Sequence, residues 1–282
     1  MTNPYLMEPP CLISFSGGRT SAFMLHEILR AHDGKLPSDV HVVFANTGKE
    51  REETLRFVQE CGERWGVHIT WVERTFDAKG FEIVNHNSAS RNGEPFVRVI
   101  KRRGFLPNAV ARFCTVEMKI CAMRNFMKAQ GYSTWNNVVG LRYDEGHRVL
   151  KGIARNESGK DPWRTLWPLS KAKVTRRDVL AFWASQPFDL RLAGVEGNCD
   201  LCFLKGRSKL LSLIQRHPEL AEWWIAQEHA VKTSATSSGA RFITEFSYTD
   251  LVLAVRDQSN FLAAMDGDEH DAECGLHCGA AA

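Results

Sequence analysis

A short apolar run that ends in a Ser-Gly-Gly turn and continues directly into an amphipathic helix constrains this chain most. The run spans residues 11–15, the turn is Ser16-Gly17-Gly18, and apolar residues with helical spacing follow from Ala22 to Leu29. The pattern predicts a strand, a tight loop and a helix. Glycines let the backbone approach a ligand closely, and the first amides of a helix are donors at the positive end of its dipole. The loop therefore predicts a phosphate-sized anion site, with an ordinary strand-to-helix turn as the alternative.

Hydroxyl side chains surround the same turn on its strand side and on its helix side. They are Ser14, Ser16, Thr20 and Ser21. Each adds a hydrogen-bond donor near the expected anion. The patterns GxxxxGK[ST] and GxGxxG are both absent, so the loop is neither a Walker loop nor a dinucleotide-binding loop. The segment from Ser16 to Ser21 resembles the Ser-Gly-Gly-x-Thr-Ser PP-loop of the ATP pyrophosphatase superfamily.

This resemblance implies a fold, a ligand and two kinds of chemistry. In the superfamily the loop holds the pyrophosphate of ATP, which leaves as the substrate is adenylated, and the sheet is of the adenine nucleotide alpha hydrolase type. One branch contains the phosphoadenylylsulfate (PAPS) and adenylylsulfate (APS) reductases. Another contains the DNA phosphorothioation sulfurtransferases and their phage-encoded relatives.

Strand and helix patterns alternate through the first part of the chain. Apolar runs predict strands at 40–45, 67–72 and 134–139, and residues 52–65 predict a helix. This succession predicts an α/β fold with a doubly wound, mostly parallel sheet and binding groups at the carboxyl ends of its strands. Three parts are expected, namely a nucleotide-binding α/β domain at 10–190, a helical region with a C-x-x-C motif at 191–265, and a mobile tail at 266–282.

The middle of the chain is less regular. Residues 75–109 show little periodicity, and we expect a long loop that carries the basic run Lys101 to Arg103. This run is suited to clamp a polyanionic substrate, and an ordinary solvated charge run is the alternative. Trp223 and Trp224 are expected to pack a helical layer back on the sheet. Helices are expected at 116–130, 175–186, 205–216, 218–231 and 248–256.

Two further loops lie at the ends of predicted strands. Asn46-Thr47-Gly48 follows the strand at 40–45 and is expected to face the adenine or ribose, with a plain turn as the alternative. Gly140 and Arg142 follow the strand at 134–139, where backbone approach and a guanidinium suit a phosphate or sulfate. An ordinary surface arginine is the alternative there. The predicted nucleotide-binding residues are Ser14, Ser16, Gly17, Gly18, Thr20, Ser21, Asn46, Thr47, Gly48, Gly140 and Arg142.

Composition and cysteine usage indicate the compartment. Residues 1–10 have neither a basic region nor an apolar core, so no secretory signal is expected, and no apolar run approaches the ~20 residues that span a bilayer. Eight cysteines in such a chain favour metal ligation or thiol chemistry over disulfides. The formal net charge of +3 allows a nucleotide or nucleic-acid partner without requiring one. We expect a cytoplasmic protein without membrane contact.

The cysteines fall into two groups. Cys11 and Cys61 lie in an expected strand and an expected helix, where they behave as small buried hydrophobes. The apolar surroundings of Cys121 also favour core packing. Cys199-x-x-Cys202 presents two thiolates on one turn, which suits zinc, an iron–sulfur cluster or a redox pair, and no zinc-finger histidine spacing follows it. Two more ligands are required, and the candidates are Cys114, Cys121, Cys274 and Cys278.

Comparison with the APS reductases assigns these candidates by resemblance. Those enzymes carry a vicinal Cys-Cys and a Lys, followed later by a C-x-x-C, and together these hold a [4Fe–4S] cluster. Cys114 and Lys119 match the first element, although Thr115 stands where the second cysteine is expected. Cys199 and Cys202 match the second element. The resemblance therefore implies a [4Fe–4S] cluster, with zinc as the alternative, on Cys114, Cys199, Cys202 and Cys278, with Cys121 or Cys274 as other choices for the fourth ligand.

The C-terminal tail carries a second resemblance. The run from Glu273 to His277 is identical to the Glu-Cys-Gly-Leu-His tail of assimilatory sulfonucleotide reductases, whose cysteine takes the sulfite group from the nucleotide. This implies that Cys274 is the catalytic nucleophile, and the cations Arg142 and Lys119 are expected to activate it. The phage-encoded relatives show a Cys-x-x-x-Cys tail, which Cys274 and Cys278 also match, so Cys278 is a fourth cluster ligand or a resolving thiol.

Taken together, these features predict an enzyme of the PAPS reductase family that binds ATP or a sulfonucleotide (PAPS or APS), with Mg²⁺ as a further cofactor. The favoured reaction is sulfonucleotide reduction through Cys274, with a thioredoxin-like protein as reductant. The alternative is an ATP-dependent, pyrophosphate-releasing sulfurtransferase that thiolates a nucleic acid or a small molecule, with a cysteine desulfurase as partner. A nucleotide- or metal-sensing regulator is a third hypothesis. A homo-oligomer is expected in each case.

Overall fold

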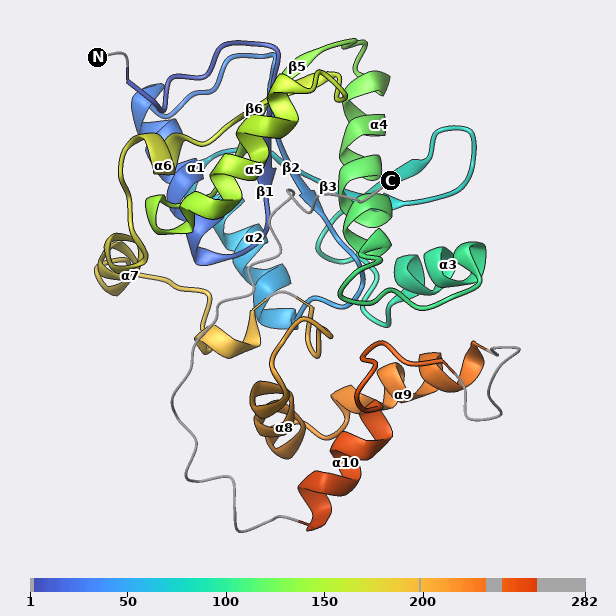
Figure 1. The fold of residues 1–282 in the computed structure, drawn as a ribbon. Coiled ribbons are helices and arrows are strands. Elements are labelled where there is room, and N and C mark those ends of the chain that lie inside the picture. Colours follow the sequence, from blue (N-terminus) through green and yellow to red (C-terminus); the bar gives the residue numbers. More distant parts are fainter. Residues whose placement is uncertain (1–2, 198, 232–239, 258–282) are drawn as a thin grey trace.

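Six strands form one sheet within the residues that the structure, a computed structural model, describes: 3–197, 199–231 and 240–257 (Figure 1). Their order is β4-β3-β2-β1-β5-β6, and every neighbouring pair is parallel except β3 with β4. This confirms the predicted doubly wound, mostly parallel α/β fold. The strands are β1 (Cys11–Phe15), β2 (Val40–Ala45), β3 (Ile69–Arg74), β4 (Phe81–Val84), β5 (Trp135–Val139) and β6 (Trp163–Leu166).

The order in which successive strands are added to the sheet reverses beside β1. β2 and β3 lie on one side of β1, whereas β5 and β6 lie on the other. Ser14 of β1 pairs with Val43 of β2 and with Val139 of β5, so the loops after these three strands start at the same edge of the sheet. Open α/β sheets bind their ligands in the crevice at such a switch point. The loops that follow β1 and β5 therefore lie where this class of fold binds nucleotides.

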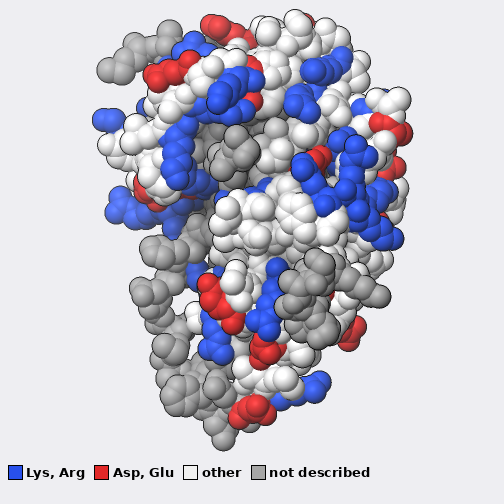
Figure 2. Space-filling model, turned by 45° about the vertical axis from the view of Figure 1, so that its right-hand side comes forward, with Lys and Arg blue, Asp and Glu red and all other residues white. Residues whose placement is uncertain are grey.

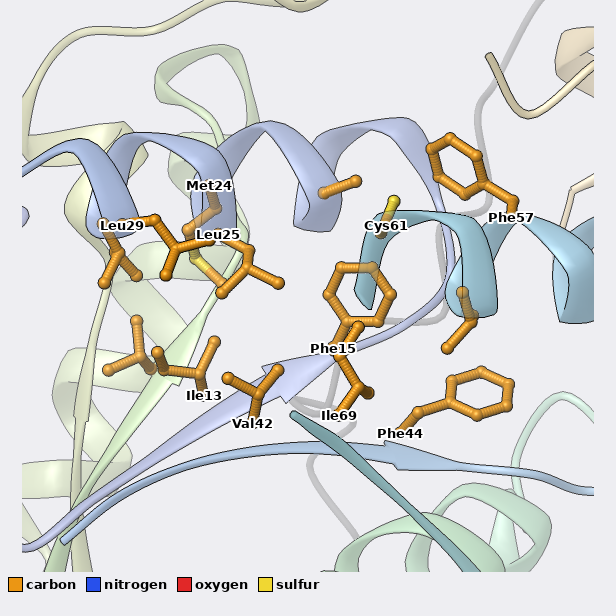
Figure 3. Close-up of a cluster of buried hydrophobic side chains, with 14 of the residues drawn as sticks. Ile13, Phe15, Met24, Leu25, Leu29, Val42, Phe44, Phe57, Cys61 and Ile69 are labelled. Carbon is orange, nitrogen blue, oxygen red and sulfur yellow. The ribbon is translucent and has the colours of Figure 1, made fainter. Parts of the chain in front are cut away.

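One face of the sheet is covered by a large apolar layer. Ile13 and Phe15 of β1 and Phe44 of β2 point toward α1 and α2, because alternate residues of a strand share a face (Figure 3). Leu25 of α1 and Cys61 of α2 are fully buried in this layer, as predicted. The helices on this side are α1 (Arg19–Ala31), α2 (Glu52–Trp65), α6 (Pro168–Lys171) and α7 (Arg176–Ala184).

The other face of the sheet is covered by α4 (Ala122–Ala129), whose Met123 and Phe126 pack with Leu12 and Val43. The helix expected at 116–130 is therefore not one α-helix. Its first part, η1 (Thr115–Cys121), is a π-helix, and α4 begins only at Ala122. π-helical turns are rare and often occur at functional sites. This wide turn begins directly after Cys114, one of the candidate cysteines.

A second, separate core lies beneath the carboxyl edge of the sheet. Trp224 packs against Phe96 and Phe242, and its ring stacks on that of Tyr248 with 5.1 Å between centroids. Trp223 also contacts Phe96, so the expectation that this Trp pair packs on the sheet is wrong. The helices around this core are α3 (Glu94–Arg103), α8 (Arg207–Arg216), α9 (Leu220–Ala230) and α10 (Tyr248–Asp257).

Residues 75–109 are not the long loop that was expected, because they contain β4 and α3. β4 has only 4 residues, and its Glu82 and Ile83 are exposed at the edge of the sheet. α3 has 10 residues, and both elements are too short to show a clear period in the sequence. No helix in the described ranges is long and apolar enough to cross a membrane. The remaining elements are η2 (Tyr143–Glu145), α5 (Gly146–Glu157) and η3 (Gly194–Glu196).

Candidate functional site

The loop between β1 and α1 is shaped by its two glycines. Gly17 has a φ of +76°, and a Cβ at this position would lie 2.7 Å from Cγ2 of Thr54 and 3.0 Å from Cγ2 of Val58. Only glycine fits this combination of backbone conformation and space. Gly18 is the N-cap residue of α1 and provides no side chain to cap the helix. The first turn of α1 contains no acidic residue. The positive end of α1 is therefore directed at the loop without a competing carboxylate on its own first turn.

The serines of this loop hold one another. The hydroxyl of Ser16 donates to Oγ of Ser21 over 2.9 Å, and the Ser21 hydroxyl donates to the carbonyl of Gly18 over 3.0 Å. The backbone amide of Ser16 also donates to Oγ of Ser21, over 3.2 Å. Ser14 lies deeper and donates its hydroxyl to Oδ1 of Asn137 on β5. The loop is thus held in one conformation by its own hydrogen bonds.

The loop after β5 closes on this site from the other side of the switch point. A Cβ at Gly140 would lie 3.4 Å from Cα of Ser21, so β5 approaches the start of α1 closely. The guanidinium of Arg142 donates to Oγ1 of Thr20 over 3.0 Å and pairs with Asp144 at 3.0 Å and with Glu145 at 3.6 Å. Arg142 is only 5% exposed. It contacts Thr20 of the β1 loop, and its direct contact with a nucleotide stays a prediction.

Arg19, the variable position of the loop motif, has a role that the sequence analysis missed. Its guanidinium donates to both carboxylate oxygens of Asp189, at 2.7 and 2.6 Å, and to the carbonyl of Leu192. Its own carbonyl accepts a hydrogen bond from the indole of Trp183. These contacts join the start of α1 to α7 and to the segment after it. No local pattern could have shown them, because Asp189 lies 170 residues away in the chain.

The loop after β2 is built from buried polar groups. Asn46 and Thr47 have no exposed surface. The amide of Asn46 donates to Oε1 of Glu73 over 2.6 Å, and the hydroxyl of Thr47 donates to Oε2 of Glu50 over 2.8 Å. Gly48 has a φ of +77° and leaves no room for a side chain against Gly93. Both predicted nucleotide-facing side chains therefore support the loop from inside, and their contact with an adenine or ribose stays a prediction.

The Cys-x-x-Cys segment lies directly against the β2 loop. Cys199 forms a β-bridge with Glu50, and its sulfur lies 3.6 Å from Oγ1 of Thr47. Lys119 of η1 reaches the same place, with its ammonium 3.8 Å from Oε1 of Glu50. Burial, followed by the charge of Glu50, raises the pKa of the Cys199 thiol well above its ordinary value.

A buried ion pair fixes this segment to the β2 loop. The ammonium of Lys49 lies 2.8 Å from Oδ2 of Asp200, and both side chains are under a tenth exposed. The other oxygen of Asp200 accepts the indole hydrogen of Trp224. Lys205 donates to three backbone carbonyls of the segment, including that of Cys199 at 2.6 Å. Sequence reasoning missed both lysines, because isolated lysines in loops carry no recognisable pattern.

The described residues do not complete a metal site. Cys114 and Cys199 both border the second core, and Cys202 is close enough to Cys199 to contribute to the raised pKa of its thiol. Within the described ranges, however, no three His, Cys, Asp or Glu side chains are grouped closely enough to hold a metal ion. Cys121 is buried beside Arg124, which supports its predicted core role. Cys274 and Cys278, the predicted nucleophile and fourth ligand, lie outside the described residues.

Comparisons with known proteins found similar sequences over much of this chain. Residues 10–186 match the model of the phosphoadenosine phosphosulfate reductase domain. The chain is 30% identical over 211 residues to the uncharacterized nin region protein ORF290 of Escherichia phage lambda, covering 71% of this chain and 67% of the phage protein. It is 27% identical over 146 residues to an uncharacterized protein of Methanocaldococcus jannaschii, and the match covers 51% of this chain and only 25% of that protein.

A solved structure was also found, the U34-tRNA thiolase NcsA from Methanococcus maripaludis with its [4Fe–4S] cluster. The TM-score is 0.35 at 11% sequence identity, with 92% of this chain and 76% of that chain covered. The family model spans more than half of the chain and includes the β1 loop, the β2 loop and the β5 loop. On this evidence the chain belongs to the phosphoadenosine phosphosulfate reductase family.

Proposed function

We propose that this chain binds an adenine nucleotide at the β1 loop and uses it in sulfur chemistry at the carboxyl edge of the sheet. One observation carries the proposal. The Gly17-Gly18 turn and the uncapped start of α1 lie at the switch point of the sheet, where Gly140 and Arg142 close the other side. Such a turn offers backbone amides and a helix dipole to an anion, and it leaves no side chain in the way.

The specific reaction that this geometry supports best is an ATP-dependent sulfur transfer. An oxygen of the acceptor attacks the α-phosphorus of ATP and pyrophosphate leaves; a sulfur nucleophile then displaces AMP from the activated acceptor. The complete Ser-Gly-Gly-x-Thr-Ser loop, with its chain of hydroxyls from Ser16 through Ser21, favours a bound pyrophosphate. Mg²⁺ would neutralise part of the phosphate charge in this scheme. A carbonyl or phosphate oxygen is a suitable acceptor group.

Sulfonucleotide reduction is the second candidate, and one sequence observation favours it. The run Glu273 to His277 places a cysteine in the tail, where Cys274 would attack the sulfur of PAPS or APS and release the nucleotide. A thioredoxin-like dithiol would then reduce the resulting thiosulfonate and free the sulfite.

The cysteines of the second core support a thiol- or metal-dependent part of the proposal. Cys199 and Cys202 lie together behind the β2 loop, and Cys114 borders the same core. Because the described residues supply no closed ligand set, the [4Fe–4S] cluster, or zinc in its place, stays a proposal. We derive no catalytic step from it. Metal and acid-labile sulfide analysis of anaerobically purified protein distinguishes the two.

Nucleotide-dependent thermal stability tests the proposed site. ATP with Mg²⁺ should raise the melting temperature more than PAPS or APS does, and Ser16→Ala with Ser21→Ala should reduce that shift, since each lost hydrogen bond is worth about 1 kcal/mol. Ser38→Ala, an exposed serine in the turn before β2, is the matched control and should behave like the wild type. A larger shift with PAPS or APS would favour the reductase, and no shift with any of the three would contradict the site.

A further inference from the structure

Positive charge in this chain is concentrated in one segment that the proposed nucleotide site does not use. Residues 74–128 contain eleven Lys and Arg but only four Asp and Glu, an excess of seven positive charges, whereas the whole chain has a formal net charge of +3. The rest of the chain is therefore acidic on balance. The segment includes β4, α3, η1 and most of α4, which lie on one side of the molecule (Figure 1). Figure 2, with that side turned forward, shows Lys and Arg gathered there with few Asp and Glu among them.

The most exposed part of this side is the end of α3. Lys101, Arg102 and Arg103 close the helix, and each is exposed. Arg103 pairs with Glu117 of η1. Among the described residues no carboxylate forms an ion pair with Lys101 or Arg102, so both charges are available to a partner. An exposed cation that no carboxylate neutralises attracts anions from solution.

Aromatic rings alternate with these cations. The guanidinium carbons of Arg74 and Arg102 both lie 4.7 Å from the ring centroid of Phe76. Phe105 follows the basic run, rests edge-on against Phe113 at 5.0 Å, and still has 44% of its surface exposed. Single-stranded nucleic acids are held in this way, with phosphates on Lys and Arg and bases stacked on aromatic rings or guanidinium planes.

This surface is connected to the cysteine region by one core. Val99 and Ile100 on the inner side of α3 share that core with Leu201 and Phe203, which lie inside and directly after the Cys-x-x-Cys motif. A helix with its side chains is about 10 Å across. A strand bound on the outer side of α3 would therefore lie about one helix diameter from the core that the candidate cysteines border.

We propose that Phe76, Lys101, Arg102 and Phe105, here called the α3 surface, bind a single-stranded nucleic acid as the macromolecular substrate. That this strand accepts the sulfur rests on the proposed function, whereas the binding itself does not. A small nucleotide needs one anion pocket, which the β1 loop already provides. A run of cations interleaved with an exposed ring suits the repeating phosphates and bases of a strand, and it makes an acidic protein the less fitting partner.

Fluorescence anisotropy with labelled RNA and DNA single strands of about 20 nucleotides tests this proposal on the full chain. Lys101→Glu with Arg102→Glu should weaken binding at least about tenfold and lower the slope of log Kd against log salt by about 1.4, or about 0.7 for each lost phosphate contact. Phe105→Ala should weaken binding about fivefold or more, and Phe105→Leu, which keeps an apolar side chain but no ring, should behave like Phe105→Ala. Lys35→Glu with Lys160→Glu is the matched control, because it makes the same charge change at exposed positions outside residues 74–128.

The outcomes separate the alternatives. If Lys101→Glu with Arg102→Glu and Lys35→Glu with Lys160→Glu weaken strand binding equally, net charge alone explains the effect and the proposal is overturned. Displacement of the strand by polyglutamate as efficiently as by unlabelled oligonucleotide, with Phe105→Ala unchanged, would indicate an acidic protein partner and also overturn it. If ATP raises the melting temperature but no strand binds, this inference alone is refuted. If a strand binds but no nucleotide raises the melting temperature, the proposed function alone is refuted. Circular dichroism confirms that each variant is folded.

Discussion

The β1 loop and the Cys-x-x-Cys segment lie at the same edge of the sheet, but different forces hold them. The glycine turn of the β1 loop is held by backbone geometry and by hydrogen bonds among Ser16, Gly18 and Ser21, all close in sequence, although Arg19 and Thr20 beside it also have distant partners. The Cys-x-x-Cys segment is held by the Lys49–Asp200 ion pair and by Lys205, across large separations in sequence and with little exposure to water. The difference teaches that a tight glycine turn can be encoded locally, whereas the position of the Cys-x-x-Cys segment depends on partners from distant parts of the chain.

The two kinds of contact also differ in energy. A hydrogen bond between neutral groups contributes about 1 kcal/mol net. Removing one partner of a buried ion pair costs about 3–5 kcal/mol, because the remaining charge is left without compensation in a medium of low dielectric constant. The cysteine segment should therefore respond more strongly to single substitutions than the hydroxyls of the nucleotide loop do.

Lys49→Met should produce the largest effect. It leaves the Asp200 carboxylate buried and unpaired, so we expect the free energy of unfolding to fall by about 3–5 kcal/mol in urea denaturation. Lys49→Met combined with Asp200→Asn should recover part of this loss, since no unpaired charge remains. Arg64→Met is the control, because it breaks a pair with Glu60 that also has a 2.8 Å distance but is much more exposed. The control should lose under about 1 kcal/mol. Equal losses in both variants would contradict the energetic contrast between buried and exposed pairs.

Gly17→Ala tests the backbone geometry of the nucleotide loop. The positive φ and the contact of 2.7 Å with Thr54 together should cost about 2–4 kcal/mol of stability and weaken ATP binding. Gly34→Ala is a close control, because Gly34 has a φ of +80° and a Cβ added there would meet nothing within 4 Å. It should cost about 1–2 kcal/mol from the backbone alone. Thermal melts with and without ATP measure both quantities, and an equal loss in the two variants would show that the Thr54 contact relaxes freely.

The pH dependence of the Arg19–Asp189 contact should be the smallest effect. Burial alone would raise the pKa of the Asp189 carboxyl, but hydrogen bonds from Arg19 and from backbone amides lower it below the ordinary value. A carboxyl with a lowered pKa stabilises the folded state above its unfolded pKa of about 3.9, and this stability is lost as pH falls through the folded pKa. Asp189→Asn should therefore flatten the loss of stability below about pH 5, while changing stability at pH 7 by under about 1 kcal/mol because the side chain is 36% exposed. The measurement is the free energy of unfolding from urea denaturation at several pH values. If Asp189→Asn loses as much stability below about pH 5 as the wild type does, other carboxyl groups cause that loss.

Much of the central fold could be predicted because its signals are local. The strand at 40–45 and the helix at 52–65 have the predicted bounds, and Cys11 and Cys61 are fully buried as expected. β4 and α3 were missed because each contains too few residues to repeat a pattern clearly. The second core was missed for a related reason. The apolar residues of α3 identify a buried helix face only after Trp224 and Tyr248, far along the chain, are placed against them.

The sequence by itself determined the strand, the glycine turn and the start of α1, because a positive φ and an apolar period are properties of neighbouring residues. It also determined the family. Only the tertiary structure decided that Arg142 donates to Thr20, that Arg19 binds Asp189, and that Lys49 and Glu50 bring Cys199 against the β2 loop. Each of these depends on which charge partner comes within a few ångströms after folding, and Coulomb interactions depend on that distance and on burial rather than on separation along the chain.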